Sequence, residues 1–414
     1  MFCPNCGKEV KDGAKFCPYC GKSLETNELK LSKRASKKPL SIIIPLILII
    51  VIASSLFIFV KYIKPNITSN EQETVATLIP YRKKDKWGFC DRNKKIVIQP
   101  IYDLTEDFSE GLAGVELNDK FGYIDKKGNY VIQPTYDDAY SFSEGLAEVK
   151  LNGKEGFIDK KGNLIIQPIY DWAWPFSEGL ARVGIGELLN TKWGFIDTKG
   201  NLIIQPIYDE AWSFSEGLAE VGIGKFPNTK HGFIDKKGNY VIQPIYDWAD
   251  SFSEGLAGVE LNGKCGFIDK KGNLVIQPTY DYAYDFSEGL ALVELNDKWG
   301  FIDTKGNYII QPTYDDASSF SEGLARVWLN DKFGYIDKKG NYVIQPVYDY
   351  AWSFSEGLAG VELNDKWGFI DKKGNLIIQP IYDWAGDFSE GLALVELNGK
   401  YGYIDTKGTQ YWED

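Results

Sequence analysis

The chain contains, at residues 298–312, the segment Lys298-Trp299-Gly300-Phe301-Ile302-Asp303-Thr304-Lys305-Gly306-Asn307-Tyr308-Ile309-Ile310-Gln311-Pro312, and close variants of it recur along most of the 414 residues. The position of Trp299, always followed by glycine, occurs ten times: Trp87, Phe121, Glu155, Trp193, His231, Cys265, Trp299, Phe333, Trp367 and Tyr401. Successive positions are 34 residues apart, except for two steps of 38. A fixed period in this range is typical of a repeat array, in which each unit packs against its neighbours.

One repeat predicts three strands. Residues 146–151 alternate between apolar and polar and favour a strand with one buried face, and Asn152-Gly153 is a strong hairpin turn. Residues 156–159 predict a second strand. Residues 164–167 are apolar without alternation, so we expect both faces of this third strand to be covered. Pro168 lacks a backbone donor, and we expect it to end the sheet.

The turns and the connector between repeats also have predictable roles. We expect the carboxylate of Asp159 to accept hydrogen bonds from the following turn, in which Gly162 supplies the left-handed residue. The connector, residues 170–179, carries Tyr170 and Phe176, whose counterparts occur in each full copy. We interpret these two rings as wedges between successive sheets, and Gly179 as the turn into the next strand.

The arrangement of the repeats has two solutions. Residues 78–82 and 409–414 depart from the repeat pattern and resemble caps. A closed propeller often completes one blade with a strand from the other terminus, and no such split is evident. The sequence therefore predicts an all-β domain over residues 78–414, built of about ten ~34-residue three-stranded antiparallel meanders in an open twisted array. The alternative is a closed, propeller-like ring.

The N-terminal residues 1–24 contain two Cys-x-x-Cys pairs, Cys3 with Cys6 and Cys17 with Cys20, each followed by glycine. Four thiolates at this spacing suit tetrahedral Zn²⁺. A segment this short has little core of its own, so the metal would hold the fold together. We predict a zinc ribbon with one structural zinc per chain; a redox dithiol or a disulfide pair is the alternative.

A membrane anchor is predicted next. Residues 40–60 contain no charged side chain, which predicts a transmembrane helix over residues 40–63, with a buried soluble helix as the alternative. The preceding linker, residues 25–39, is basic, which favours a cytoplasmic N-terminus and an extracytoplasmic repeat domain in the cell membrane. A cleaved signal peptide fits this pattern badly. Residues 64–77 predict a polar tether.

Charge argues against one class of partner. Residues 1–64 carry a net charge of +7, and the remaining residues carry −19. A strongly acidic array repels polyphosphate, so we expect no nucleic acid partner.

The repeat motif resembles that of the bacterial WG-repeat family. The shared pattern is Lys-Trp-Gly-Phe-Ile-Asp, Gly-Asn, Ile-Gln-Pro, Tyr-Asp and Phe-Ser-Glu-Gly-Leu-Ala, over about residues 78–412. Residues 2–24 are similar to the short zinc ribbon of many bacterial membrane proteins. The resemblance implies a β-rich repeat architecture in a surface-attached protein whose ligand it does not define.

Candidate ligand-binding residues occupy variable positions of the connector pattern Tyr-Asp-x-Ala-x-x-Phe. We select Trp172, Trp174, Trp212, Trp248, Tyr284, Trp352 and Trp384. Other repeats carry Asp138, Glu210, Asp250 or Asp316 at equivalent positions. An aromatic side chain that alternates with a carboxylate is expected to be partly exposed. Exposed rings beside carboxylates suit sugar recognition. Partial packing against the next sheet is the alternative.

Two adjacent repeats share a four-residue extension, in residues 184–192 and 222–230. These loops carry Leu188, Leu189 and Phe226, apolar residues that favour a contact surface. We predict that the two loops form a patch with Trp174 and Trp212. Passive inheritance through duplication is the alternative.

Catalysis has little support in the sequence. His231, the only histidine, takes the aromatic position of its repeat and is expected to pack there. The recurrent Ser, Asp and Glu fit turn and capping roles better than catalysis or calcium binding. We therefore expect no enzyme. We predict a binding or scaffolding protein for a surface glycan or protein, or alternatively a transmembrane sensor or assembly factor whose zinc ribbon meets a cytoplasmic protein partner.

Overall fold

The computed structural model describes residues 78–187 and 190–413, which belong to one compact unit, Ala76–Asp414. The expected zinc ribbon, linker, membrane helix and tether lie outside the described residues, as do Leu188 and Leu189. Within the described part no helix is long and apolar enough to cross a membrane.

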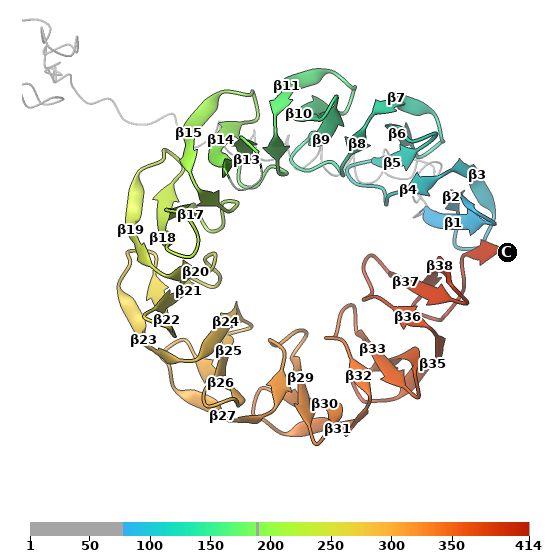
Figure 1. Ribbon diagram of the computed structural model, residues 1–414. Coiled ribbons are helices and arrows are strands. Elements are labelled where there is room, and N and C mark those ends of the chain that lie inside the picture. Colours follow the sequence, from blue (N-terminus) through green and yellow to red (C-terminus); the bar gives the residue numbers. More distant parts are fainter. Residues whose placement is uncertain (1–77, 188–189, 414) are drawn as a thin grey trace, which may run out of the picture. The chain divides into compact units, whose positions relative to one another are not determined.

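The described residues form ten small sheets, or blades, numbered here in chain order, which follow one another around a propeller-like ring (Figure 1). The two-residue or slightly longer inner strands are β4 (Leu104–Thr105), β8 (Asp138–Ala139), β12 (Trp172–Ala173), β16 (Glu210–Ala211), β20 (Trp248–Ala249), β24 (Tyr282–Ser287), β28 (Asp316–Ala317), β32 (Tyr350–Ala351), β36 (Trp384–Ala385) and β39 (Trp412–Glu413). The next strands are β1 (Ile79–Lys83), β5 (Leu112–Glu116), β9 (Leu146–Leu151), β13 (Leu180–Ile185), β17 (Leu218–Ile223), β21 (Leu256–Leu261), β25 (Leu290–Glu294), β29 (Leu324–Leu329), β33 (Leu358–Leu363) and β37 (Leu392–Leu397).

The third position is taken by β2 (Lys86–Cys90), β6 (Phe121–Asp125), β10 (Lys154–Asp159), β14 (Lys192–Asp197), β18 (Lys230–Asp235), β22 (Lys264–Asp269), β26 (Trp299–Asp303), β30 (Lys332–Asp337), β34 (Lys366–Asp371) and β38 (Lys400–Asp405). The outer strands, on the perimeter in Figure 1, are β3 (Ile96–Tyr102), β7 (Tyr130–Tyr136), β11 (Leu164–Tyr170), β15 (Leu202–Tyr208), β19 (Tyr240–Tyr246), β23 (Leu274–Tyr280), β27 (Tyr308–Tyr314), β31 (Tyr342–Tyr348) and β35 (Leu376–Tyr382). The predicted three-stranded meander is therefore present in blades 1–9, and the connector adds a short strand to blades 2–10; blade 10 consists of β36, β37 and β38.

The prediction of an open array is not confirmed, because the C-terminal strand closes the ring. Strand β39 pairs in parallel with β1 and takes the place that a short connector strand takes in the other blades. The amide of Lys84 donates to the carbonyl of Glu413 at 2.9 Å. Tyr411 is buried against Ile79 and Tyr81. The residues that resemble caps thus complete the first blade.

The outer strand differs from its prediction in length and in exposure. Strand β11 continues through Pro168 to Tyr170, because a bulge separates the pairs Phe157–Ile166 and Glu155–Tyr170. It also alternates: Ile166 is buried, whereas Ile169 is 62% exposed. A bulge and a proline at a free sheet edge both oppose pairing with another chain.

The core lies between the blades, as the wedge interpretation predicts. One cluster joins Phe157 of blade 3 to Val183 of blade 4, with Tyr170 and Phe176 of the connector buried between them. The rings of Phe157 and Phe176 meet edge to face, with their centroids 4.9 Å apart. Equivalent clusters fill the other seams. Burial of an aromatic pair at each seam therefore holds neighbouring blades together.

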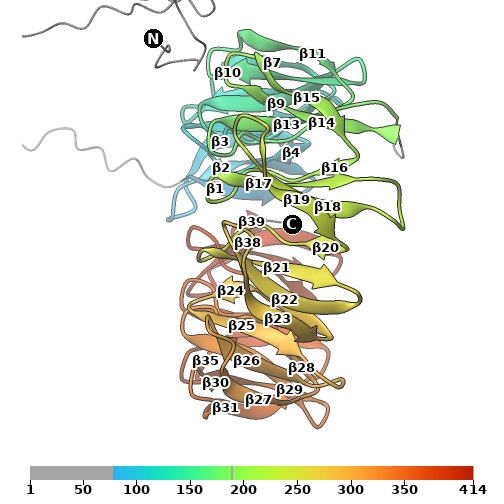
Figure 2. The same cartoon turned by 90° about the vertical axis from the view of Figure 1, so that its left-hand side faces the viewer.

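Strand register separates the loops into two faces of the ring. The pair Leu180–Asp197 places the Phe-Ser-Glu-Gly loop beside the Asp-x-Lys-Gly turn, whereas the pair Trp172–Gly184 places the start of the connector near the hairpin end. We call these the turn face and the hairpin face. In the side view the two extended hairpins, after β13 and β17, project on the same side (Figure 2). The predicted turn is confirmed: Asp159 Oδ1 accepts from the amides of Lys161 and Asn163.

Candidate binding clefts between the blades

The recurrent Asp of the Tyr-Asp motif has a structural task. One oxygen of Asp171 accepts from Lys154 Nζ, and the other accepts from the Gly186 amide at 2.9 Å. Lys154 of blade 3 is thereby bonded to the start of the connector that leads into blade 4. These contacts hold the pKa of Asp171 below its usual range, the Gly186 amide being the largest cause.

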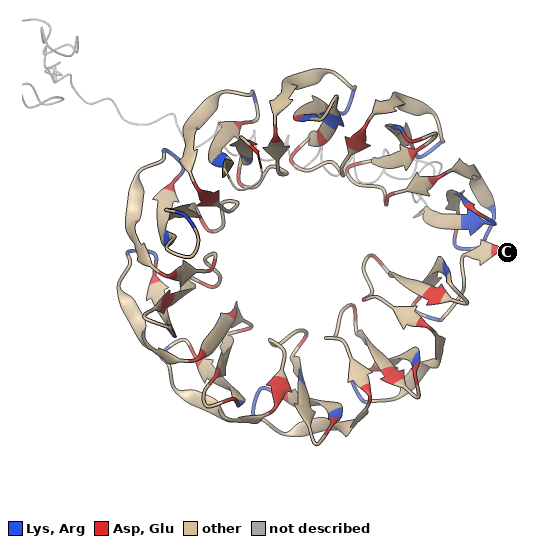
Figure 3. Ribbon diagram, in the orientation of Figure 1, with Lys and Arg blue, Asp and Glu red and all other residues tan. Residues whose placement is uncertain are grey.

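The Glu of Ser-Glu-Gly links neighbouring repeats on the turn face. Glu178 Oε2 accepts from the Gly217 amide of the next repeat at 3.1 Å and pairs with Lys236 Nζ at 3.0 Å. The preceding Ser177 hydroxyl donates to the carbonyl of Phe214 at 2.9 Å. Asp and Glu occur on the loops that point towards the centre of the ring (Figure 3). Their recurrence therefore has a structural explanation, and within residues 78–187 and 190–413 no three potential metal ligands cluster.

The predicted exposure of the connector aromatics is confirmed for most of them. Trp172, Trp174, Trp248, Tyr284 and Trp384 are exposed. Trp212 and Trp352 are half-buried. Trp352 Nε1 donates to the carbonyl of Ala385 in the next blade at 2.9 Å, which gives this indole a structural role. The exposed members are available to a ligand, and Trp352 belongs to the seam between blades.

A second variable position, missed by sequence reasoning, lies beneath the connector. It is the third residue of Leu-Ala-x-Val: Gly114, Glu148, Arg182, Glu220, Gly258, Leu292, Arg326, Gly360 and Leu394. A Cβ on Gly258 would lie 2.9 Å from Asp250 Oδ2, and one on Gly360 would lie 2.8 Å from Trp352 Cδ1. The two positions therefore vary together, and comparing them as a pair across the repeats would have revealed the site.

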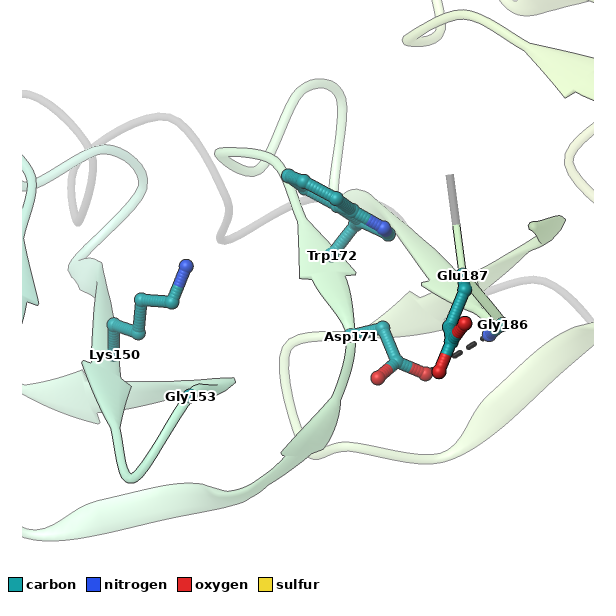
Figure 4. A pocket seen from close by; sticks show the side chains of 6 residues that line it. All are labelled: Lys150, Gly153, Asp171, Trp172, Gly186 and Glu187. Atoms are coloured by element: carbon teal, nitrogen blue, oxygen red, sulfur yellow. Dashed lines mark hydrogen bonds between the residues drawn. The ribbon is translucent and has the colours of Figure 1, made fainter. Parts of the chain in front are cut away.

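One cleft lies between blades 3 and 4 on the hairpin face. It encloses about 290 Å³ and is lined by Lys150 and Gly153 of blade 3 and by Asp171, Trp172, Gly186 and Glu187 of blade 4. Lys150 of blade 3 faces Trp172 of blade 4, with its Nζ 5.9 Å from the ring centroid, and Asp171 and Glu187 lie on the same side of the cleft as Trp172 (Figure 4). A ring face, an ammonium and two carboxylates thus surround a space of small-ligand size.

The extended loops lie next to each other, as predicted. Lys225 Nζ of the second loop donates to Asn190 Oδ1 of the first at 3.2 Å. Phe226 is 90% exposed. The first loop, however, meets Trp172 in the cleft, whereas the predicted patch named Trp174 and Trp212.

The only histidine packs as predicted. His231 is 2% exposed, and its ring centroid lies 5.9 Å from Trp212 and 5.1 Å from Trp248. Its Nδ1 lies 2.8 Å from Glu220 Oε1. Burial raises the pKa of Glu220 to about 9 and lowers the pKa of His231. Burial thus favours the uncharged form of both side chains.

Comparison with known proteins bears on the repeats and on the N-terminus. A family model described as WG containing repeat matches nine segments: residues 87–121, 121–154, 156–188, 193–225, 232–265, 266–299, 299–333, 333–367 and 367–401. A zinc-ribbon domain model matches residues 2–24. No curated protein matches the chain.

Two of the solved structures that match the chain do so at low sequence identity. A eukaryotic initiation factor structure is 12% identical, with a TM-score of 0.46, and the match covers 81% of this chain and 95% of that one. The Vibrio cholerae biofilm matrix protein Bap1 is 11% identical, with a TM-score of 0.26, covering 80% and 83%.

Proposed function

This chain belongs to the family of WG-containing repeat proteins, and from that premise we propose that its ring binds a glycan of the bacterial cell surface through the clefts between blades. The observation that carries the proposal is the cleft between blades 3 and 4, in which the exposed Trp172 faces polar groups of a neighbouring blade. Pyranose rings stack on aromatic faces, and their hydroxyl groups bond to carboxylates and ammonium groups.

The repeated design extends this surface beyond one cleft. Connector aromatics are exposed on several blades, and a second cleft, between blades 7 and 8, is also lined by connector residues. A polymer that reaches both clefts gains avidity from contacts that are individually weak. Binding without catalysis is part of the proposal.

The proposal includes the location of the ring and its N-terminal domain. The charge-free residues 40–60 form a single membrane span, with the N-terminus in the cytoplasm and the repeats outside. Cys3, Cys6, Cys17 and Cys20 would hold one structural Zn²⁺, because four thiolates meet the preference of this ion. The zinc ribbon also supports a second candidate, coupling of the ring to a cytoplasmic protein, which a pull-down dependent on residues 1–24 would test.

The test is capture of the full-length chain on the insoluble envelope polysaccharide of a bacterium. We expect Trp172→Ala to reduce capture at least fivefold, because it removes the stacking face. Ile169→Ala, which also removes an exposed apolar side chain but on the outer strand, is the matched control and should capture like the parent. Capture that survives oxidation of the glycan by periodate but not protease treatment would show a protein ligand and contradict the proposal.

A further inference from the structure

A different cleft lies between blades 7 and 8. It encloses about 270 Å³ and is lined by Tyr284 and Leu292 of blade 7 and by Asp316, Ala317, Ser318, Ser319 and Arg326 of blade 8. Tyr284 is exposed, whereas Leu292 is buried and closes the floor. The cleft thus combines a ring, two hydroxyl groups and an ion pair, because Arg326 Nη2 lies 3.3 Å from Asp316 Oδ2.

In blade 4 a tryptophan fills the equivalent space. There Arg182 takes the position of Arg326 and lies between two indoles, 4.5 Å from the centroid of Trp174 and 4.6 Å from that of Trp193. Both guanidinium groups donate to the carbonyl of the equivalent alanine in the next blade, Ala211 or Ala351. The two arginines are therefore placed in the same way by the repeat.

The covering ring differs between these two blades. Arg326 lies 4.9 Å from the Phe333 ring and 5.7 Å from the ring of Tyr350 in the next blade, but the connector residue equivalent to Trp174 is Ser318. The guanidinium that Trp174 covers in blade 4 consequently lines an open cleft in blade 8. Blade 8 therefore lacks the indole that Trp174 supplies in blade 4, and the space left is large enough for a six-membered ring.

The charges and hydroxyl groups decide which ring fits. Asp316 already neutralises Arg326, and the ring as a whole is acidic, so a second anion is repelled. Asp316 accepts hydrogen bonds, Ser318 and Ser319 both donate and accept them, and Tyr284 offers an aromatic face. Ser318 Oγ already accepts from the Arg326 amide at 3.3 Å, and Asp316 is paired with Arg326. A bare aromatic ring would offer no hydrogen bond to the remaining donor and acceptor positions of these groups, and displacing water from them is costly. An uncharged pyranose satisfies them.

We infer that the cleft between blades 7 and 8 is a subsite for one uncharged pyranose residue, which takes the place that Trp174 fills in blade 4. The inference deepens the proposed glycan binding and rests on it for its biological ligand. In this subsite the sugar stacks on the Tyr284 ring, and its hydroxyl groups form hydrogen bonds with Asp316 and the two serines. Arg326 provides the polar group at the base of the cleft.

The test measures saturation-transfer NMR of methyl glucoside and methyl N-acetylglucosaminide with the full-length chain in a detergent that has no sugar headgroup. The parent for this measurement carries Trp172→Ala, which removes the stacking face of the other cleft. We expect a signal with this parent protein, and a decrease of at least fivefold when Ser318→Trp is added. That variant rebuilds the blade 4 arrangement, so the fold tolerates it. Tyr284→Ser should lose the signal to a similar extent.

The repeats supply a matched pair of controls. Arg326→Leu should weaken binding, whereas Arg182→Leu, which changes the covered arginine of blade 4, should leave it within twofold; leucine occupies this position in blades 7 and 10. Equal signals from the parent and from Ser318→Trp would overturn the inference, even where polysaccharide capture succeeds. Preferential binding of glucuronate or of N-acetyltryptophanamide would overturn it too, in favour of an anion or an aromatic side chain. Loss of polysaccharide capture together with a Ser318-dependent pyranoside signal would refute only the proposed function.

Discussion

The glycine that follows each aromatic position is required by a close backbone contact. A Cβ on Gly300 would lie 2.6 Å from both the carbonyl oxygen of Ile310 and the nitrogen of Pro312. The same clash recurs at Gly88, Gly156 and Gly334. Backbone atoms cannot yield as a flexible side chain can, so this glycine permits the bulged outer strand to cross the second one.

The buried pair of Glu220 and His231 makes stability depend on pH. The folded-state pKa of Glu220, about 9, exceeds the ordinary value of 4.5, so its favourable contribution is present below pH 4.5 and is lost as the pH rises towards 9. The lowered pKa of His231 acts in the opposite direction: its contribution is present above pH 6.5 and is lost as the pH falls.

We expect Glu220→Gln to gain stability over the parent as the pH rises. The amide keeps a donor for the imidazole but cannot ionise, so the gain in the free energy of unfolding should be small at pH 5 and should increase steadily towards pH 9. Urea unfolding at pH 5, 7 and 9 measures it. Glu178→Gln, in which the carboxylate is solvent-accessible, should show no such rise. A constant difference between Glu220→Gln and the parent across this range would refute the neutral pair.

At the scale of elements, the extended hairpins make the same hydrogen bond to the connector aspartate as the short turns of the other blades. In blade 3 the Asn152 amide donates to Asp137 Oδ2 at 2.6 Å, and in blade 4 the Gly186 amide makes the same bond to Asp171 at 2.9 Å. The additional residues therefore add surface without changing the attachment of the hairpin to the connector.

Replacing residues 186–191 and 224–229 by Asn-Gly should leave the free energy of unfolding within about 1 kcal/mol of the parent, because surface loops contribute little. Polysaccharide capture should fall, since Gly186 and Glu187 line the cleft of blade 4. Shortening only the second loop serves as the control, because it leaves that lining intact. Undiminished capture by the doubly shortened chain would show that the loops have no part in binding.

At the scale of the whole ring, closure depends on few residues. The seam between blades 10 and 1 rests on the two-residue parallel pairing of β39, on the buried Tyr411, and on Arg82 Nε, which donates to the carbonyl of Tyr401 at 2.6 Å. Its buried cluster is smaller than those of the other seams.

We expect deletion of residues 410–414 to open the ring. The variant should have a larger radius of gyration. Limited proteolysis should cut it first in blades 1 and 10, because the edge of β1 and its apolar face become accessible. Small-angle scattering provides the first measurement. Lys83→Ala, which removes only the exposed ion pair with Glu413, is the control and should remain closed. An unchanged radius after the deletion would mean that the other blades hold the ring without this seam.

The repeat period, the strands and the aromatic wedges could be predicted because one side-chain pattern recurs in register. The closing strand could not, because Trp412 and Glu413 share no motif with the residues they replace. The clefts could be predicted only in part. The sequence singled out Trp172 because this position alternates with acids. That Arg326 lines a cleft depends on the small side chain of Ser318 on the neighbouring strand, and this pairing becomes evident only in the structure.

The pairing of β39 with β1 gives the domain the topology of a circle. In such a ring no blade is structurally the first. The chain enters and leaves the ring at one seam, and in a permuted chain the two ends could lie at any other position. A circular permutant that joined residue 413 to residue 78 through a short linker, and began instead at the exposed turn after Asp159, would keep every strand pair described above. The blade at which the chain enters the ring is therefore set by where the sequence begins to encode the circle, and there are ten possible entry points, one for each blade.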